Sequence, residues 1–359
     1  MNVWLLSAYR AESHAAWADW LVSAFSEFEW QRLELPGRHF SWRIRGNPLS
    51  WLDALPGETP ELIVATSMVD LATLKGLHPG LAGVSTVLYF HENQFAYPTS
   101  DAQTTSVEAQ MVQIYAALAA DRVLFNSDYN RRTFLDGIDA LLERMPDRVP
   151  ENVSGRIAEK SAILPVPIEP IPMGESKDAN LIAWNHRWEY DKNPDLFADA
   201  MIALAERGVD FRLALLGQRH RETPGALNRL REALPGRIVA DGALPAAAYR
   251  EVLGRAGIAV STAIHEFQGL GMLEAASAAC LPLVPDALCY PEIYPAEYRY
   301  PAGDRSALVN RLTKWLSGGA PAPVNVERWS APQLEWAWRR SLLDQGTRFH
   351  AAMDPSGVA

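Results

Sequence analysis

The segment from Ser261 to Glu274 concentrates groups that could do chemistry, with two glutamates and two glycines in one loop. It joins a short apolar run to a helix-compatible stretch, so it includes a helix N-terminus. Such an N-terminus offers unpaired N–H groups and a positive dipole end to an anion, most often phosphate. Glu266 precedes the helix and Glu274 lies about one turn inside it, and carboxylates accept hydrogen bonds from sugar hydroxyls. The segment therefore favours a sugar nucleotide as ligand, and a solvated pair of glutamates is the alternative.

Two cations follow another predicted strand. Arg187 and Lys192 bracket a turn before Pro194, a residue well suited to the first position of a helix. At the mouth of a parallel sheet, an arginine fork and a lysine point charge can bind a diphosphate between them. The alternative is a pair of surface cations that answer Glu189 and Asp191.

A third polar group follows the apolar run that ends at Phe90. His91, Glu92, Asn93 and Gln94 place four polar side chains at a strand end, and aromatic and proline residues come after them. This order is typical of the lining of a cleft, where His91 could bond a sugar hydroxyl or share a proton with an acceptor. A structural histidine is the alternative.

The segment from Gly37 to Trp51 interleaves cations with aromatic rings. No acid occurs from Leu35 to Leu52, and the segment contains Arg38, Phe40, Trp42, Arg43, Arg45 and Trp51. Cations for phosphates and flat rings for unpaired bases are what recognition of single-stranded nucleic acid requires. A solvated loop whose tryptophans fill a core is the alternative.

The elements that must position these groups alternate between short apolar strands and longer amphipathic helices. In the first half we expect strands over 2–6, 62–65, 84–90 and 123–125, a turn over 7–13, and helices over 14–28, 69–75 and 106–119. In the second half we expect strands over 181–184, 211–216, 237–240, 257–260 and 283–284, and helices over 194–207, 227–234, 245–255 and 269–280. Such alternation implies parallel sheets, whose ligands bind beyond the carboxyl ends of the strands.

The length and a proline-rich stretch predict two domains. At 359 residues the chain exceeds the size at which one core keeps growing, and four prolines between Leu164 and Gly174 mark a semi-rigid linker. We therefore expect two Rossmann-like, doubly wound α/β domains with a cleft between them, over 1–168 and 173–328.

The composition excludes several classes of protein. Hydrophobic residues make up 48% and charged residues 21%, as in ordinary globular proteins. No apolar run approaches the roughly 20 residues of a membrane span, and the first strand lacks the features of a signal peptide, so we expect a cytoplasmic protein without membrane contact. A formal charge of −10 argues against a broadly basic nucleic-acid binder, although a local patch can lie on an acidic body. Cys280 and Cys289 are too few for a disulfide scaffold and lack metal-ligand spacing, so we expect structural thiols.

Taken together, the motifs resemble a known enzyme family. Arg187 and Lys192, followed by Glu266 and Glu274 in an E-x7-E arrangement, resemble the retaining glycosyltransferases of family 4, which have the GT-B fold. The similarity to the tRNA-queuosine α-mannosyltransferase branch runs over nearly the whole chain. It is carried by Tyr89-Phe90-His91-Glu92-Asn93-Gln94 with Tyr97-Pro98, Trp42-Arg43-Ile44-Arg45, Phe125-Asn126-Ser127 and Asn185-His186-Arg187-Trp188-Glu189.

The resemblance implies a donor site and a set of catalytic residues. In the family, the positions matching Arg187 and Lys192 bind the donor diphosphate and the position matching Glu274 holds the ribose. The transferred sugar and its phosphate contact the position matching Glu266 and the backbone amides of Phe267, Gln268, Gly269 and Leu270. We count Asn185 with these donor-binding residues. Facing the donor sugar from the other domain is the position matching His91, which completes a catalytic set with Arg187, Lys192 and Glu266.

The resemblance also implies the two substrates. The donor would be GDP-mannose and the acceptor the cyclopentenediol of queuosine in the anticodon loop of tRNA for aspartate. No metal or other cofactor is implied, because the cations and the helix dipole stabilise the leaving diphosphate. The candidate acceptor-binding residues are Ser13, His14, Arg38, Trp42, Arg43, Arg45, Glu92, Asn93, Gln94, Asn126 and Ser127.

One departure and one further element follow from the comparison with that branch. The branch usually has two glycines before Ser13 and His14, where this chain has Arg10-Ala11-Glu12. Either the first loop contacts the acceptor differently, or the acceptor is not the same one. In GT-B proteins a C-terminal helix commonly crosses back onto the first domain, here over about 333–355. This helix contains Trp336 and Trp338, and Trp329 precedes it. We expect all three tryptophans to pack in a core.

Two other functions remain compatible with the sequence. A family-4 transferase with another sugar nucleotide and a lipid or small-molecule acceptor would use the same second domain, and the acidic body suits it slightly better than tRNA. Salt dependence of acceptor binding discriminates between them, because phosphate contacts weaken steeply with salt. A noncatalytic RNA- or nucleotide-binding module on a GT-B scaffold is the second alternative, and the presence or absence of donor transfer decides it.

Overall fold

The computed structural model describes residues 1–97, 107–218 and 225–343, without the side chains of residues 12 and 13. The chain divides into two compact units. The first unit comprises Met1–Val166 and the chain from Leu334 onward, and the second comprises Pro167–Gln333. The chain passes from the first unit to the second within the proline-rich stretch, and it returns to the first unit within helix α12 (Ala331–Leu343). Within the described residues, no helix combines the length and apolar character that crossing a membrane requires.

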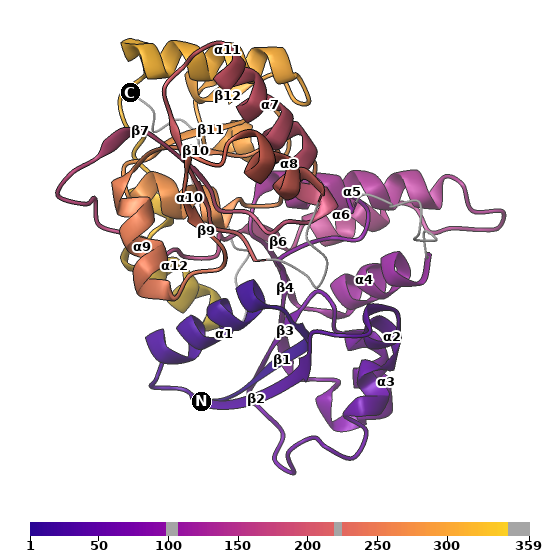
Figure 1. Ribbon diagram of the computed structural model, residues 1–359. Coiled ribbons are helices and arrows are strands. Elements are labelled where there is room, and N and C mark those ends of the chain that lie inside the picture. The colour runs from indigo at the N-terminus through magenta and orange to yellow at the C-terminus, as the bar shows by residue number, and fades with distance from the viewer. Residues whose placement is uncertain (98–106, 219–224, 344–359) are drawn as a thin grey trace. The chain divides into compact units, whose positions relative to one another are not determined.

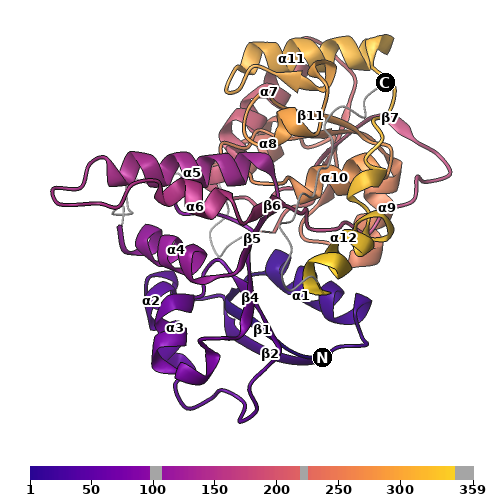
Figure 2. The ribbon, with the colours of Figure 1, turned by 180° about the vertical axis from the view of Figure 1, so that it is seen from behind.

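The first unit is built on a six-stranded parallel sheet with the order β2-β1-β3-β4-β5-β6. Its strands are β1 (Asn2–Arg10), β2 (Glu29–Pro36), β3 (Leu62–Thr66), β4 (Ser85–Phe90), β5 (Arg122–Phe125) and β6 (Ser161–Ile163). Its helices are α1 (Glu12–Ala24), α2 (Phe40–Ser50), α3 (Leu71–Leu77), α4 (Val107–Ala119), α5 (Asp128–Leu142) and α6 (Val153–Ala158). Helix α1 lies on one face of the sheet and α2 and α3 lie on the other (Figures 1 and 2). Because both faces are covered, the central strands consist of buried apolar residues.

The second unit has a parallel sheet with the order β12-β11-β10-β7-β8-β9. Its strands are β7 (Asp178–Trp184), β8 (Arg212–Leu215), β9 (Ile238–Asp241), β10 (Ala256–Val260), β11 (Leu281–Pro285) and β12 (Arg299–Tyr300). Its helices are α7 (Pro194–Glu206), α8 (Gly225–Ala233), α9 (Ala246–Arg255), α10 (Leu270–Ser277) and α11 (Arg305–Lys314). The strand order reverses between β7 and β10, so the loops after these two strands meet at a topological switch point, where doubly wound sheets bind ligands.

The predicted strands and helices of both halves are confirmed with small shifts at their ends, but the start of the chain differs from the prediction. Strand β1 continues to Arg10, so the predicted turn from Ser7 is wrong, and α1 ends at Ala24, earlier than predicted. Strand β2 was not predicted. It lies at the sheet edge and is half exposed, so it has polar residues where a buried strand would have an apolar run. The short edge strands β6 and β12 were also not predicted, because neither has a run of buried apolar residues.

The C-terminal tryptophans divide into buried and exposed positions. Trp329 and Trp338 are buried, which confirms their core packing, but Trp336 is 67% exposed, so the prediction was wrong for that residue. Trp338 donates its indole N–H to the Pro165 carbonyl at 3.0 Å, and its ring lies 4.9 Å from that of Tyr89. The predicted helix is observed as α12 up to residue 343, and its remainder lies outside the described residues.

We predict that Trp338→Ala destabilises the first unit by about 3–5 kcal/mol, because it empties a fully buried indole site and leaves the Pro165 carbonyl without its donor. The matched control is Trp336→Ala on the exposed side of the same helix, which is expected to change stability by less than about 0.5 kcal/mol. Urea unfolding followed by circular dichroism measures both. Equal losses in the two variants would contradict the packing described for α12.

Candidate active site

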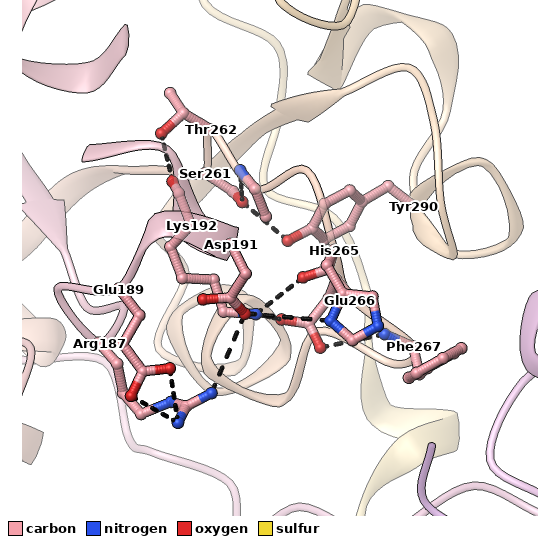
Figure 3. A network of polar contacts seen from close by, with 11 residues as sticks. Arg187, Glu189, Asp191, Lys192, Ser261, Thr262, His265, Glu266, Phe267 and Tyr290 are labelled. Carbon is pink, nitrogen blue, oxygen red and sulfur yellow. Dashed lines mark hydrogen bonds and ion pairs between the residues drawn. The ribbon is translucent and has the colours of Figure 1, made fainter. Parts of the chain in front are cut away.

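The loops after β7 and β10 meet around the ammonium group of Lys192 (Figure 3). Its Nζ lies 2.8 Å from the His265 carbonyl oxygen, 3.2 Å from Glu266 Oε2 and 3.2 Å from Asp191 Oδ2. The Lys192 side chain is only 9% exposed. A buried ammonium group therefore has two carboxylates and a carbonyl as direct partners.

Backbone contacts hold the two loops in this register. The Asp191 carbonyl accepts hydrogen bonds from the N–H groups of Ile264 and His265 at 2.9 and 3.2 Å. The Thr262 hydroxyl donates to the carbonyls of Lys192 and Asn193, both at 2.9 Å. The loop after β10 is therefore fixed to the short 3-10 turn η2 (Tyr190–Lys192) before any ligand binds.

Asn193 joins this turn to α7. It has a left-handed backbone with φ of 49°, a conformation that asparagine tolerates better than most residues. Its side chain accepts a hydrogen bond from the Leu196 N–H at 3.3 Å and so caps the helix, with Pro194 at the first helical position. The sequence Lys192-Asn193-Pro194 thus ends the loop and begins α7, while the Lys192 side chain lies against the loop after β10.

The electrostatics of this cluster keep both partners charged. Burial by itself raises the pKa of Glu266, but Lys192 and the Gly269 N–H outweigh burial and lower that pKa to about 2. Burial by itself lowers the pKa of Lys192, but Glu266 and Asp191 outweigh it and leave that pKa above its usual value. Glu266 is therefore a carboxylate and Lys192 is an ammonium ion across the physiological pH range.

Two buried histidines beside the cluster are neutral. Burial, with the charge of Lys192 as the next cause, lowers the pKa of His186 and of His265 to about 4 each. The ring of His265 lies 4.8 Å from that of Phe267 in an edge-to-face arrangement. Neither imidazole adds a positive charge at neutral pH, which leaves Lys192 as the buried cation of this group.

Arg187 differs from Lys192 in being half exposed, with 51% of its side chain accessible. Its guanidinium group lies 2.9 Å from Glu189 and 4.0 Å from Asp191. The pairing with these two acids is the one named as the alternative from sequence. It also holds the guanidinium group at the edge of the loop, where an incoming anion can reach it.

The loop after β10 ends in a glycine that begins α10. Gly269 has φ of +71°, and a Cβ there would lie 2.9 Å from the Tyr290 ring, so both backbone strain and space require glycine. Its N–H donates to the Glu266 carboxylate. The next N–H groups, of Leu270 and Gly271, belong to the first helical turn, which has no carbonyl partners within the helix. This N-terminus can present N–H groups and a positive dipole end to a phosphate.

Glu274 is oriented by a residue that the sequence did not reveal. The Tyr249 hydroxyl, on α9, donates to Glu274 Oε2 at 2.8 Å and accepts from Asn185 Nδ2 at 3.1 Å. The same Asn185 amide donates to the Gly271 carbonyl at 2.7 Å. Burial raises the pKa of Glu274, whereas the Tyr249 hydrogen bond favours its ionised form. Only the tertiary fold brings Tyr249 here, so no motif in the sequence could have found it.

In the first unit, His91 lies in an aromatic cluster at the end of β4. Its ring stacks on that of His14 with centroids 4.2 Å apart and lies 4.8 Å from Trp17 and 4.7 Å from Tyr89. Burial and the neighbouring His14 hold the pKa of His91 well below its usual value. Its Nε2 has no hydrogen-bond partner among the residues that the structure describes. His91 is thus a neutral imidazole with one buried ring nitrogen that has no partner within the described residues.

The other polar residues after β4 and β5 mostly bond within the first unit. Asn93 Nδ2 donates to the Asn130 and Thr133 side chains, each at 2.9 Å, and Asn93 Oδ1 accepts two backbone N–H groups. Asn126 donates to the His91 carbonyl at 2.8 Å, and Ser127 caps α5. These three residues shape the loops around His91, whereas Gln94 Nε2 has no partner within the described residues.

The remaining candidate acceptor residues lie on or beside α2, directly after His91, or among the side chains that the structure does not describe. Arg38, Trp42, Arg43 and Arg45 lie on or beside α2, which corrects the interpretation of that segment as a loop. Glu92 is half-buried, and its carbonyl accepts a hydrogen bond from Ser67. The structure does not describe the side chain of Ser13. It also does not describe the side chain of Glu12, which stands where the related branch usually has glycine.

Comparison with known proteins establishes the family. Residues 2–168 match the family model for the N-terminal part of tRNA-queuosine alpha-mannosyltransferase. The chain is 34% identical over 360 residues to the tRNA-queuosine alpha-mannosyltransferase of Drosophila melanogaster, covering 93% of this chain and 94% of that protein. This chain belongs to the tRNA-queuosine α-mannosyltransferase family. It is accordingly a glycosyltransferase, as the motifs predicted.

Solved glycosyltransferase structures share its fold at low sequence identity. A lipopolysaccharide outer core galactosyltransferase in its apo form aligns with a TM-score of 0.64 at 13% identity, over 95% of this chain and 99% of that one. Sucrose-phosphate synthase from Thermosynechococcus elongatus aligns with a TM-score of 0.66 at 13% identity, over 96% and 94%. HepE from Anabaena in complex with UDP-glucose aligns with a TM-score of 0.64 at 11% identity, over 95% and 98%. Together with the two six-stranded parallel sheets, these matches confirm the predicted GT-B fold.

We predict that Tyr249→Phe weakens binding of the nucleotide part of the donor by about tenfold, because a hydrogen bond to a half-buried carboxylate is lost. If Glu274 holds the ribose, the penalty for removing a ribose hydroxyl from GDP should shrink in the variant. Titration calorimetry with GDP and its deoxyribose analogues measures both effects. Tyr298→Phe is the control, since that hydroxyl bonds the Ala322 carbonyl of the same unit. An unchanged ribose penalty in Tyr249→Phe would contradict the orienting role.

We predict that the charge of Glu266 contributes stability that acid removes. Its folded pKa of about 2 lies below the ordinary 4.5, so the stabilisation is complete above about pH 4.5 and is lost as the pH falls towards 2. Glu266→Gln should therefore lower the free energy of unfolding near neutral pH and flatten its decline over that interval. Urea unfolding at a series of pH values compares the two proteins. Parallel pH profiles would show that Glu266 is not held in its ionised form.

Proposed function

We propose that this protein transfers mannose from GDP-mannose to the cyclopentenediol of queuosine in the anticodon loop of tRNA for aspartate, with retention of anomeric configuration. The relative from Drosophila melanogaster, similar over nearly the whole chain, supports the acceptor and the sugar. The same proposal makes it a cytoplasmic enzyme with no metal or other cofactor besides its sugar nucleotide.

The observation that carries the proposal is the buried Lys192 ammonium group beside the N-terminus of α10 at the switch point. A lysine point charge and the free N–H groups of a helix are the groups that a departing diphosphate needs. Arg187, half exposed at the edge of the same loop, adds a second cation. These groups are in place before the negative charge on the leaving group develops.

The two carboxylates suit the hydroxyl-bearing parts of the donor. Glu266 is ionised beside the helix N-terminus, so it can accept hydrogen bonds from the sugar and stabilise positive charge on its ring. Glu274 lies farther into α10, where Tyr249 orients one of its oxygens and leaves the other for the ribose. In a sugar nucleotide the transferred sugar and the ribose lie at opposite ends of the diphosphate, and the proposal assigns Glu266 to the sugar and Glu274 to the ribose.

Retention requires no protein nucleophile in this mechanism. Cleavage of the bond between the anomeric carbon and GDP leaves an oxocarbenium-like mannose. The acceptor hydroxyl oxygen then forms a bond to the anomeric carbon on the same face, and the leaving phosphate accepts the hydroxyl proton. Lys192 and the α10 N–H groups stabilise that phosphate. A neutral His91 can bond a sugar hydroxyl through the ring nitrogen that lacks a protein partner.

The test incubates the protein with queuosine-containing tRNA and a panel of GDP- and UDP-sugars, followed by mass analysis of the modified nucleoside. We expect one added hexose with GDP-mannose alone. Product with a UDP-sugar instead would replace the donor, and the absence of product with every donor would overturn the proposed reaction.

The variant Lys192→Met keeps the length of the side chain and removes its charge. We expect its turnover to fall about 100- to 1000-fold, as on loss of a transition-state hydrogen-bond donor. Circular dichroism must show a folded protein, because the change leaves two buried carboxylates without their cation. Retained turnover in folded Lys192→Met would sink the assigned role.

A further inference from the structure

Helix α2 is fixed rigidly to the first unit although its outer side is exposed. The buried Asn47 amide donates to the Arg43 and Met68 carbonyls at 2.8 and 3.1 Å, and Asn47 Oδ1 accepts from the Asp70 N–H at 3.1 Å. The Asp70 carboxylate, buried at the start of α3, bonds Arg45 Nη1 at 2.7 Å. A single asparagine and a single ion pair therefore hold this helix to the neighbouring loop and helix.

The indole of Trp42 lies flat on Gly46, one turn further along α2. A Cβ at Gly46 would be 2.4 Å from Cε2, 2.6 Å from Cζ2 and 2.7 Å from Cδ2 of that indole. These three atoms belong to the six-membered ring, and Nε1 is not among the nearest atoms, so the ring covers Gly46 with its face and not with its edge. Trp42 is nevertheless 55% exposed, so its opposite face is open to solvent.

The surroundings of this exposed ring are cationic. Arg38 is exposed, Arg45 is half exposed, and Arg43 reaches the Ser50 hydroxyl at 3.5 Å. No acidic residue occurs between Leu35 and Leu52, although the whole chain carries a formal charge of −10. A planar ring among arginines on an acidic protein matches a polyanion with exposed bases better than an apolar protein surface.

We propose that Trp42, seated on Gly46, is a stacking platform for one unpaired base of the RNA acceptor, with Arg38, just before α2, and the arginines of α2 contacting the adjacent phosphates. The inference rests on the proposed function for the identity of the acceptor as RNA. It adds a binding position separate from the sugar-transfer chemistry. Because every base has a flat face, the platform recognises an unpaired nucleotide and not a particular base.

The glycine provides a variant that leaves the tryptophan and all charges unchanged. Gly46→Ala places a methyl group within the volume of the indole, so the ring must leave its seat, while alanine favours the helix more than glycine does. Trp42→Ala removes the ring altogether. The matched control is Trp336→Ala, which removes an exposed tryptophan from α12 of the same unit.

The experiment measures binding of a labelled anticodon stem-loop by fluorescence anisotropy, with GDP-mannose binding measured separately by calorimetry. We expect Trp42→Ala to raise the Kd for RNA roughly 5- to 150-fold, the range of base–aromatic stacking, and Gly46→Ala to raise it in the same direction. GDP-mannose binding and the RNA affinity of Trp336→Ala should match the wild type. A Kd for Trp42→Ala within about twofold of the wild type, outside that stacking range, would overturn the platform.

Salt and a competitor separate stacking from charge. The slope of log Kd against log salt should be unchanged in Trp42→Ala and should fall in Arg38→Ala, since only phosphate contacts release counterions. A fully paired RNA hairpin stem should compete poorly, and equal competition would refute recognition of an unpaired base. Failure of the proposed reaction would be distinguishable: no sugar would be transferred to RNA although the stem-loop still bound through Trp42.

Discussion

The donor site depends on a lysine that is almost removed from water. Burying an ammonium group costs several kcal/mol unless charged and polar groups replace its hydration. Here Glu266, Asp191 and the His265 carbonyl do so, each within 3.2 Å. Because these groups come from both loops, the ion cluster also fixes the loops to each other. The proposed diphosphate site is thus ordered by the Lys192 ammonium group and the two carboxylates beside it, with Arg187 at its edge.

Much of the second unit could be predicted from sequence, since its central strands contain continuous apolar runs and four of its helices, α7 to α10, begin at or just after a proline or glycine. Pro194 and Gly269 mark the starts of α7 and α10 almost directly, and the motif residues stand next to them. The contacts of Tyr249 could not be predicted, because they depend on packing between helices and loops far apart in the chain. A surface pair with acids and a diphosphate clamp also look alike in sequence, and the pairing of Arg187 with Glu189 and Asp191 shows only the first of these two roles.

The first unit was harder for a different physical reason. Polar residues after strand ends can bind a ligand or support a loop, and residue type does not distinguish the two. Asn93, Asn126 and Ser127 use their polar groups within the fold, whereas His91 keeps one ring nitrogen without a partner. The helix α2 was not foreseen either, because it contains Gly46 and Pro48, which usually count against a helix. Tertiary contacts of Asn47 outweigh that weak local preference.

The aromatic cluster around His91 joins three distant parts of the chain. Tyr89 contacts both His91 and Trp338, and its hydroxyl bonds the Leu164 carbonyl, while Trp338 bonds the carbonyl of the next residue, Pro165. The surroundings of the histidine are therefore complete only when a helix near the end of the chain has docked. During synthesis most of the first unit is made before the second unit, but the first unit is completed only when α12 has been made. A chain stopped before α12 would retain the residues of the lysine cluster but would lack the Trp338 ring beside Tyr89, so an intact environment of His91 requires translation through α12.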